Sequence, residues 1–221
     1  MSSQLPPSSQ RTSSSQQSSS LQPASSSQSS IAAAAQSPDE RFDVVDEHDR
    51  VVRQATRAEV HKHGLLHRAV HAWVVRSDGR LVLQMRSAAK DQHPLTWTSS
   101  ASGHVDAGET YAAAIEREVQ EELGLPAAIA ANLRPLARFA ACTELGNEFT
   151  ELFFVQYDGP LSPAPAEIER LEARSLTAWN DAVAELPKTF SPSLRFLLEH
   201  AGPTVDAMTA RRSSTHRPPN E

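Results

Sequence analysis

Residues 103–125, GHVDAGETYAAAIEREVQEELGL, decide how the rest of this 221-residue sequence is interpreted. Glu118, Glu121 and Glu122 are spaced i, i+3 and i+4, so a helix places all three carboxylates on one face. Carboxylates this close repel one another unless a cation lies between them, and hard cations such as Mg²⁺ prefer oxygen ligands. The spacing therefore indicates a metal platform for phosphate chemistry. A solvent-exposed acidic helix face is the alternative interpretation of the three glutamates taken alone.

The same segment predicts a helix over residues 110–123. Thr110 is a suitable first or capping residue, and Gly124 stands where a left-handed residue ends many helices. Gly103 and Gly108 permit a tight loop before the helix, in which a backbone carbonyl can reach a metal ion. Apolar residues at helical spacing predict the buried face of the helix: Ala113, Ile115, Val119 and Leu123.

Strands and helices interleave along the rest of the sequence. Apolar and β-branched patterns predict extended structure in six segments: residues 43–52, 70–75, 81–85, 97–105, 136–143 and 151–157. A turn signal at Ser77-Asp78-Gly79 predicts that the second and third of these form a hairpin. Helices are predicted over residues 176–186 and 191–200, and a linker or helical turn over 56–63. The interleaving predicts an α/β or α+β fold with a mixed sheet.

Composition divides the chain into three parts. Residues 1–38 consist mainly of Ser, Gln, Pro and Ala, whose small apolar surface cannot offset the entropy of ordering, so a disordered tail is expected. Residues 39–201 are expected to form one domain, and residues 202–221 a mobile C-terminal tail. We expect a cytoplasmic protein. A Ser-rich, acid-poor N-terminus is also typical of organelle transit peptides, although these usually carry more Arg.

Charge and composition exclude several classes of protein. The net charge is -6 and no basic stripe with interleaved aromatic residues occurs, so nucleic acid is not an expected partner. Cys142 is the only cysteine, which excludes a disulfide framework and a cysteine zinc site. No apolar run approaches the roughly 20 residues that span a bilayer, so no membrane partner is expected. Nothing in the sequence indicates an oligomeric state.

The quoted segment matches a known motif at every fixed position. The Nudix box, G-x5-E-x7-R-E-U-x-E-E-x-G-U with U apolar, is matched by Gly103, Glu109, Arg117, Glu118, Val119, Glu121, Glu122, Gly124 and Leu125. The chain therefore resembles the Nudix hydrolase superfamily. This resemblance implies a Nudix α/β/α sandwich with a mixed β-sheet. It also implies hydrolysis of a diphosphate bond in a small organic substrate, of the nucleoside diphosphate-X or isoprenyl diphosphate type.

The resemblance further implies a role for each residue of the box. The three clustered glutamates would bind Mg²⁺, with Mn²⁺ as the alternative ion, and the Gly103 carbonyl would join them. Arg117 would hold a glutamate in place and Glu109 would brace the loop. The bound metals would neutralise charge, activate water and align the substrate.

The general base differs among members of this superfamily, so its identity stays open. Within the box, Glu118 and Glu121 are the candidates. Outside it, Glu148 and Glu151 are candidates, because they lie just before or at the start of a predicted strand.

Short motifs around the box resemble isopentenyl-diphosphate isomerase and its hydrolase-like relatives: His67-Arg68-Ala69, Gly79, Leu83-Gln84-Met85-Arg86-Ser87, Lys90, Pro94, Trp97-Thr98 and Gly103-His104. This narrower resemblance implies that Arg86 and Lys90 contact substrate phosphates, which suits their charge. The alternative is a solvated basic loop.

The isomerase resemblance also implies a second metal site. His61, His67 and His104 match its metal-binding histidines, and Glu151 or Glu148 would complete the set. The alternative is that the histidines are hydrogen-bonded packing residues near a pocket.

Two departures favour hydrolysis over isomerisation. Ser102 occupies the position of the isomerase's catalytic cysteine, and a serine hydroxyl does not titrate near neutral pH. The box is also complete here, whereas isomerases have a degraded one. An isomerase-like enzyme and a non-catalytic Nudix-fold binding module remain as alternatives, and the intact glutamates argue against the second.

Overall fold

The computed structural model describes residues 37 and 39–215, the last seven of them as backbone only. Most of the expected N-terminal tail and the last six residues therefore lie outside the described part. Within the described part, no helix is long and apolar enough to cross a membrane.

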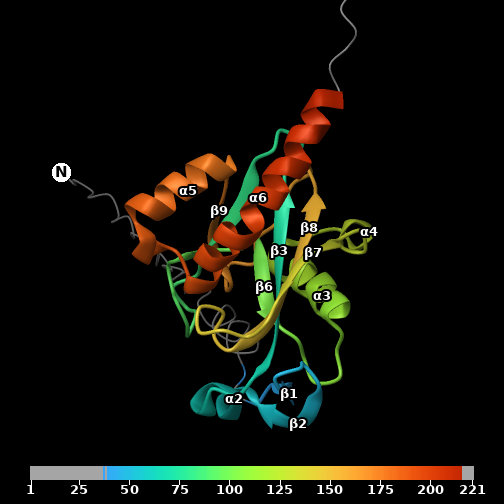
Figure 1. Cartoon of the computed structure of the whole chain (residues 1–221), viewed down its shortest axis with the longest axis vertical. Coiled ribbons are helices and arrows are strands. Elements are labelled where there is room, and N and C mark those ends of the chain that lie inside the picture. Colours follow the sequence, from blue (N-terminus) through green and yellow to red (C-terminus); the bar gives the residue numbers. More distant parts are fainter. Residues whose placement is uncertain (1–36, 38, 216–221) are drawn as a thin grey trace, which may run out of the picture.

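A seven-stranded mixed sheet forms the centre of the fold (Figure 1). Its main order is β5-β4-β3-β8-β7, with β6 pairing β3 and β9 pairing β4. Only β3 and β8 pair in parallel, with His67 opposite Glu148; the other pairs are antiparallel. The strands are β3 (His67–Val75), β4 (Leu81–Arg86), β5 (Trp97–Thr98), β6 (Ala101–His104), β7 (Arg134–Phe139), β8 (Glu148–Gln156) and β9 (Ile168–Arg174).

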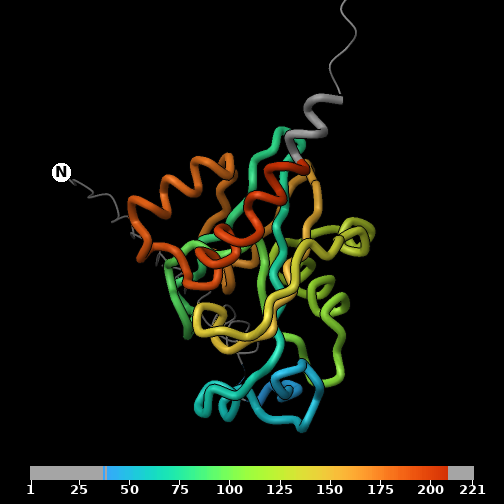
Figure 2. Tube along the Cα trace, viewed as in Figure 1, coloured from blue at the N-terminus to red at the C-terminus, as the bar shows by residue number. Residues whose placement is uncertain are grey.

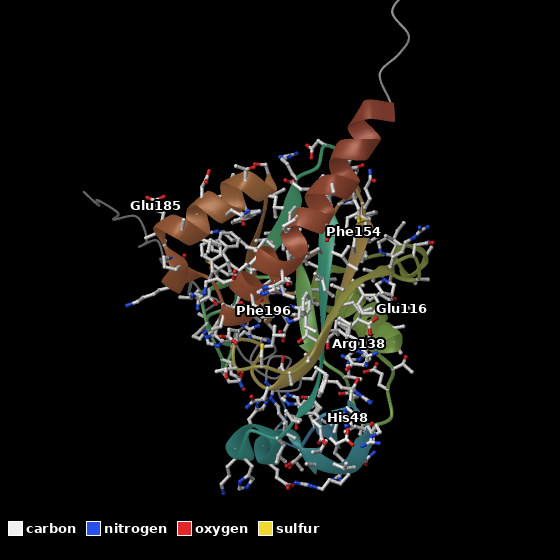
Figure 3. All side chains as sticks on the ribbon, in the orientation of Figure 1. His48, Glu116, Arg138, Phe154, Glu185 and Phe196 are labelled. Carbon is white, nitrogen blue, oxygen red and sulfur yellow. The ribbon has the colours of Figure 1, made fainter. Side chains whose placement is uncertain are left out.

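Helices cover both faces of this sheet. On one face, α3 (Tyr111–Leu123) packs on residues such as Val70 and Phe153, with the short α4 (Ala127–Ala130) beside it. On the other face, α5 (Leu176–Glu185) and α6 (Pro192–Thr215), joined by η1 (Pro187–Thr189), pack on the alternate residues. Phe154 on β8 and Phe196 on α6, labelled in Figure 3, belong to this second cluster. The predicted α/β/α sandwich with a mixed sheet is confirmed.

A small unit lies at one end of the sheet, where Figure 2 shows residues 41–63 at the bottom of the molecule. It consists of the hairpin of β1 (Arg41–Val45) and β2 (Val51–Thr56) and of α2 (Arg57–His63). Its own core is four buried side chains: Phe42, Val44, Ala55 and Val60. The backbone of this unit bridges to the loop before α3, where the Ala107 N–H donates to the Arg41 carbonyl at 2.9 Å.

The structure differs from the sequence-based expectations in four places. β9 was not predicted, since its sequence IERLEAR lacks clear alternation; pairing with β4 stabilises it. α6 continues beyond the predicted end at residue 200, because Val205 is buried and Met208 packs against the same cluster. β7 ends before Cys142, which lies in the following turn. On α3, Ala114 is buried and Ala113 is exposed.

Candidate functional site

The predicted carboxylate platform lies on α3. The Thr110 side chain caps its first turn by accepting from the Ala113 N–H at 3.2 Å, and Gly124 ends it with φ 61°. Glu122 faces inward with 3% of its surface exposed, whereas the Glu121 side chain is 62% exposed. The helix therefore presents the three glutamates at graded depth rather than as a solvated acidic face.

The two inner glutamates share a poorly solvated environment. Glu122 Oε2 accepts from the Gln84 Nε2 at 2.8 Å and from the Ser102 N–H at 3.1 Å. Burial raises the pKa of Glu122 to about 8, and the neighbouring Glu118 carboxylate adds to the shift. Burial likewise raises the pKa of Glu118 to about 7, although Arg117 opposes it. Oxygen ligands that resist ionisation without a cation fit a hard divalent metal ion.

Arg117 holds this platform in place. Its Nε and Nη2 donate to the two Glu109 oxygens at 3.2 and 2.9 Å, and its Nη1 donates to Glu118 Oε1 at 2.6 Å. Its Nη2 also donates to the His104 carbonyl at 3.2 Å. Glu109 in turn accepts from the Asp106 N–H at 3.1 Å. Arg117 and Glu109 thus fix the loop relative to the helix and orient Glu118.

Gly103 lies directly against the platform. A Cβ at this position would collide with the carboxyl group of Glu118. The absence of a side chain therefore lets the backbone approach the metal-ligand candidates closely, as expected for a carbonyl ligand.

The platform forms one wall of a cleft with a volume of about 570 Å³. A smaller lobe of about 120 Å³ adjoins it. The two share five lining residues: Arg57, Lys90, Ser102, Gly103 and His104. Glu118, Glu121 and Glu122 line the larger lobe only, so carboxylates and basic side chains are spread along one continuous site.

The structure places the two predicted phosphate-binding residues in this cleft. Arg86 lines the smaller lobe, where its Nε donates to the Gln92 carbonyl at 3.0 Å and burial lowers its pKa. Lys90 lines both lobes and forms an ion pair with Glu167. Neither side chain belongs to a solvated basic loop.

Three histidines meet beside the cleft. One ring nitrogen from each of His61, His67 and His104 lies within 4.8 Å of the others. Because the Leu65 carbonyl can only accept, His67 Nδ1 donates to it at 2.9 Å, and the buried Nε2 is the nitrogen that remains available as a ligand atom. Burial lowers the pKa of His104 to about 4 and also lowers that of His61. Neutral rings of this kind are suitable metal ligands.

Glu148, and not Glu151, is the carboxylate beside these histidines. Its Oε1 lies 3.4 Å from His67 Nε2 and 3.3 Å from His104 Nε2. Burial alone would raise the pKa of Glu148, but the adjacent His104 and His67 side chains lower it overall. Since side chains alternate along β8, Glu151 points to the opposite face, where it pairs in register with Arg138 of β7, labelled in Figure 3.

Two residues of the site were missed from the sequence. Glu167 precedes the unpredicted β9 and lines the larger lobe. Arg57 begins α2; it forms ion pairs with Glu40 and Asp91 and donates to His104 Nδ1 at 3.2 Å. No local pattern marks either residue, because each reaches the cleft through tertiary pairing.

Comparisons with known proteins find a matching family model, similar sequences and a similar solved structure. The NUDIX domain family model matches residues 65–198. An isopentenyl-diphosphate Delta-isomerase of Serratia proteamaculans is 31% identical over 158 residues, which cover 69% of this chain and 86% of that protein. Nudix hydrolase 3 of Arabidopsis thaliana is 33% identical over 147 residues, 63% of this chain but 19% of that protein. The crystal structure of DR0079 from Deinococcus radiodurans has a TM-score of 0.66 and 29% identity, covering 73% of this chain and 99% of that one.

Proposed function

The chain belongs to the NUDIX domain family, and from this premise we propose that it hydrolyses a diphosphate bond in a small, polar organic substrate with Mg²⁺. The observation that carries the proposal is the buried pair Glu118 and Glu122, which faces a cleft that also contains basic side chains. An acidic pair with raised pKa values beside a phosphate-sized basic lobe is suited to binding a divalent cation and a diphosphate together.

The metal ligands in this proposal are the three glutamates of α3 and the Gly103 carbonyl. Mg²⁺ bound there supplies charge neutralisation and an activated water, and Mn²⁺ is the alternative ion. Arg117 and Glu109 act through Glu118, because their hydrogen bonds set where its carboxylate points. They are positioning residues.

Arg86 and Lys90 are proposed to bind the phosphate oxygens of the substrate. No described carboxylate forms an ion pair with Arg86, although its side chain is largely buried. A buried cation without a paired anion is unfavourable, and a bound diphosphate would offset that cost. Lys90 lies where the lobes meet, so its ammonium can reach phosphate oxygens in either one.

The lining of the smaller lobe favours a polar substrate over an isoprenyl diphosphate. Apart from Ala69 and Gly103, every residue that lines it carries a polar or charged side chain. A hydrocarbon chain bound there would deprive several of these groups of water, at roughly 1–3 kcal/mol for each unsatisfied group. We therefore assign the diphosphates of hydroxyl-bearing groups, such as nucleosides, as substrates.

Release of phosphate and diphosphate with Mg²⁺ tests this assignment. We expect kcat/KM for nucleoside diphosphates or ADP-ribose to exceed that for isopentenyl, dimethylallyl and geranyl diphosphates by at least about tenfold, the equivalent of one such unsatisfied group. Reactions with EDTA in place of Mg²⁺ provide the control. A preference for geranyl diphosphate would contradict the substrate assignment while leaving the hydrolase intact.

An isomerase-like activity is the second candidate function, since isomerases are among the similar proteins. Ser102 argues against it, because its hydroxyl does not titrate near neutral pH and so is a poor proton donor or acceptor for an isomerase. Its backbone N–H donates to Glu122. Proton exchange between isopentenyl diphosphate and solvent would be the decisive observation in its favour.

We also propose a second metal site at His61, His67 and His104, with Glu148 as the carboxylate. The buried Nε2 atoms of His61 and His67 support it, because neither has a hydrogen-bond partner among the described residues. The test is to equilibrate the protein with excess Mn²⁺, desalt it and measure its metal content. We expect the His104→Asn variant to retain one ion per chain fewer than the wild type. The matched control is His93→Asn, an exposed histidine at the smaller lobe, which should retain all ions. Equal metal content in the wild type and His104→Asn would rule the site out.

A further inference from the structure

Glu167 is held in the cleft by backbone contacts on two sides. Its carbonyl accepts from the Ser87 N–H at 2.9 Å, just beyond β4, and its N–H donates to the Ala164 carbonyl at 2.9 Å. The Ala164 N–H donates in turn to the Glu122 carbonyl at 2.8 Å, near the end of α3. The segment before β9 is therefore docked on the metal-binding helix and on the strand that leads to Arg86. This anchoring fixes the Glu167 carboxylate in the same lobe as the three glutamates.

The two oxygens of the Glu167 carboxylate have different surroundings. The residue is 9% exposed, and Oε2 pairs with the Lys90 ammonium. Oε1 is buried and, among the described residues, has no hydrogen-bond partner. A buried acceptor without a donor is unfavourable, so such an atom indicates a donor that binds during function.

Most other carboxylates of the cleft already have hydrogen-bond partners or are exposed to solvent. Glu118 accepts from Arg117, and Glu122 accepts from Gln84 and Ser102. Glu148 lies between two histidine rings in the other lobe, and Glu121 is mostly in solvent. Two described carboxylates of the larger lobe have a buried oxygen without a hydrogen-bond partner, namely Asp106 Oδ1 and Glu167 Oε1. The Asp106 side chain is 43% exposed, whereas that of Glu167 is 11% exposed and is paired with Lys90.

We propose that Glu167 is the general base of the hydrolysis, an inference that rests on the proposed function. Oε1 accepts a proton from the attacking water as the water oxygen forms a bond to phosphorus. The bond from that phosphorus to the bridging oxygen breaks, and the leaving phosphate departs with the electron pair. Glu167 then releases its proton to solvent. Lys90 holds Oε2 through the ion pair and lies close to the phosphates of the substrate.

The test uses Glu167→Gln in the full chain, on whichever nucleoside diphosphate or ADP-ribose the wild type cleaves fastest. The amide keeps an oxygen for Lys90 but cannot accept the proton. We expect kcat to fall by roughly 10²–10³-fold, the usual contribution of a general base. KM and Mn²⁺ affinity should change less than about twofold. The matched control is Glu169→Gln, which should retain wild-type kcat. Glu169 lies on β9 two residues after Glu167, and its side chain is exposed.

Chemical rescue distinguishes a base from a structural residue. Glu167→Ala should be similarly impaired, and added formate should restore activity in proportion to its concentration, because the small carboxylate can occupy the space left by the side chain. A wild-type kcat in Glu167→Gln, absence of rescue in folded Glu167→Ala, or a large loss of Mn²⁺ affinity would each overturn the assignment. An inactive wild type on the whole panel would instead overturn the proposed function, and this inference with it.

Discussion

Replacing Glu122 by Gln is expected to lower kcat/KM by roughly 10³-fold while the protein remains folded, since a bound metal contributes several kcal/mol of transition-state stabilisation. Glutamine has nearly the same volume, and its amide oxygen can still accept from Gln84 and Ser102. The change removes the charge that a divalent cation needs at the most buried ligand position. Steady-state kinetics with Mg²⁺ and direct Mn²⁺ binding measure the two expected losses.

Glu116→Gln provides the control for this variant. Glu116 lies on the same helix, is labelled in Figure 3 and does not line the cleft. Its substitution removes one negative charge from α3 without touching the platform, so kcat/KM should be unchanged. Full activity in Glu122→Gln would show that the buried carboxylate is not a metal ligand in turnover.

The second large effect is a pH-dependent stability of the metal-free protein. The pKa values of Glu118 and Glu122, about 7 and about 8, lie above the ordinary value near 4.3 because both side chains are buried. Between the ordinary pKa near 4.3 and these raised pKa values, the folded state binds more protons than the unfolded state. Stability that is fully present below about pH 4 is therefore lost as the pH rises through 7 and 8. The loss should reach a few kcal/mol, which lowers Tm by on the order of 10 °C for a chain of this length.

Thermal unfolding between pH 5 and pH 9, in EDTA and in saturating Mg²⁺, measures this dependence. Mg²⁺ should raise Tm strongly at pH 8 and little at pH 5, since it stabilises only the ionised carboxylates. Glu122→Gln should flatten the EDTA curve, because one of the two titrating groups is gone. If the wild-type curves of Tm against pH are parallel with and without Mg²⁺, the raised pKa values of the two glutamates are not the cause of the pH dependence.

The platform could be predicted from the sequence because its spacing is local. A helix converts the i, i+3, i+4 pattern into one face, and Gly103 and Gly124 mark the two ends of the segment. The choice between Glu148 and Glu151 could not be settled in this way. It depends on which face of β8 each side chain takes, and thus on the parallel register with β3.

Glu167 and Arg57 show where sequence patterns stop being informative. Glu167 reaches the cleft because β9 pairs with β4, an interaction between segments more than 80 residues apart in the sequence. Arg57 does so because a small hairpin unit packs beside the main sheet. Such long-range pairings leave no periodicity in the residues involved. The continuation of α6 was missed for a different reason, since Arg and Pro residues outweighed the apolar positions Val205 and Met208.

The three histidines bring the small β1–β2–α2 unit and the main sheet together at one candidate metal site. His61 belongs to α2, whereas His67 and His104 belong to β3 and β6 of the main sheet. A metal ion bound by all three would link the small unit to the main sheet. The small unit has a core cluster of four buried side chains among the described residues, so this link would contribute much of its stability. Local opening of that unit would then require release of the ion. The same unit carries Arg57, so metal occupancy and the shape of the phosphate-binding lobe would be linked.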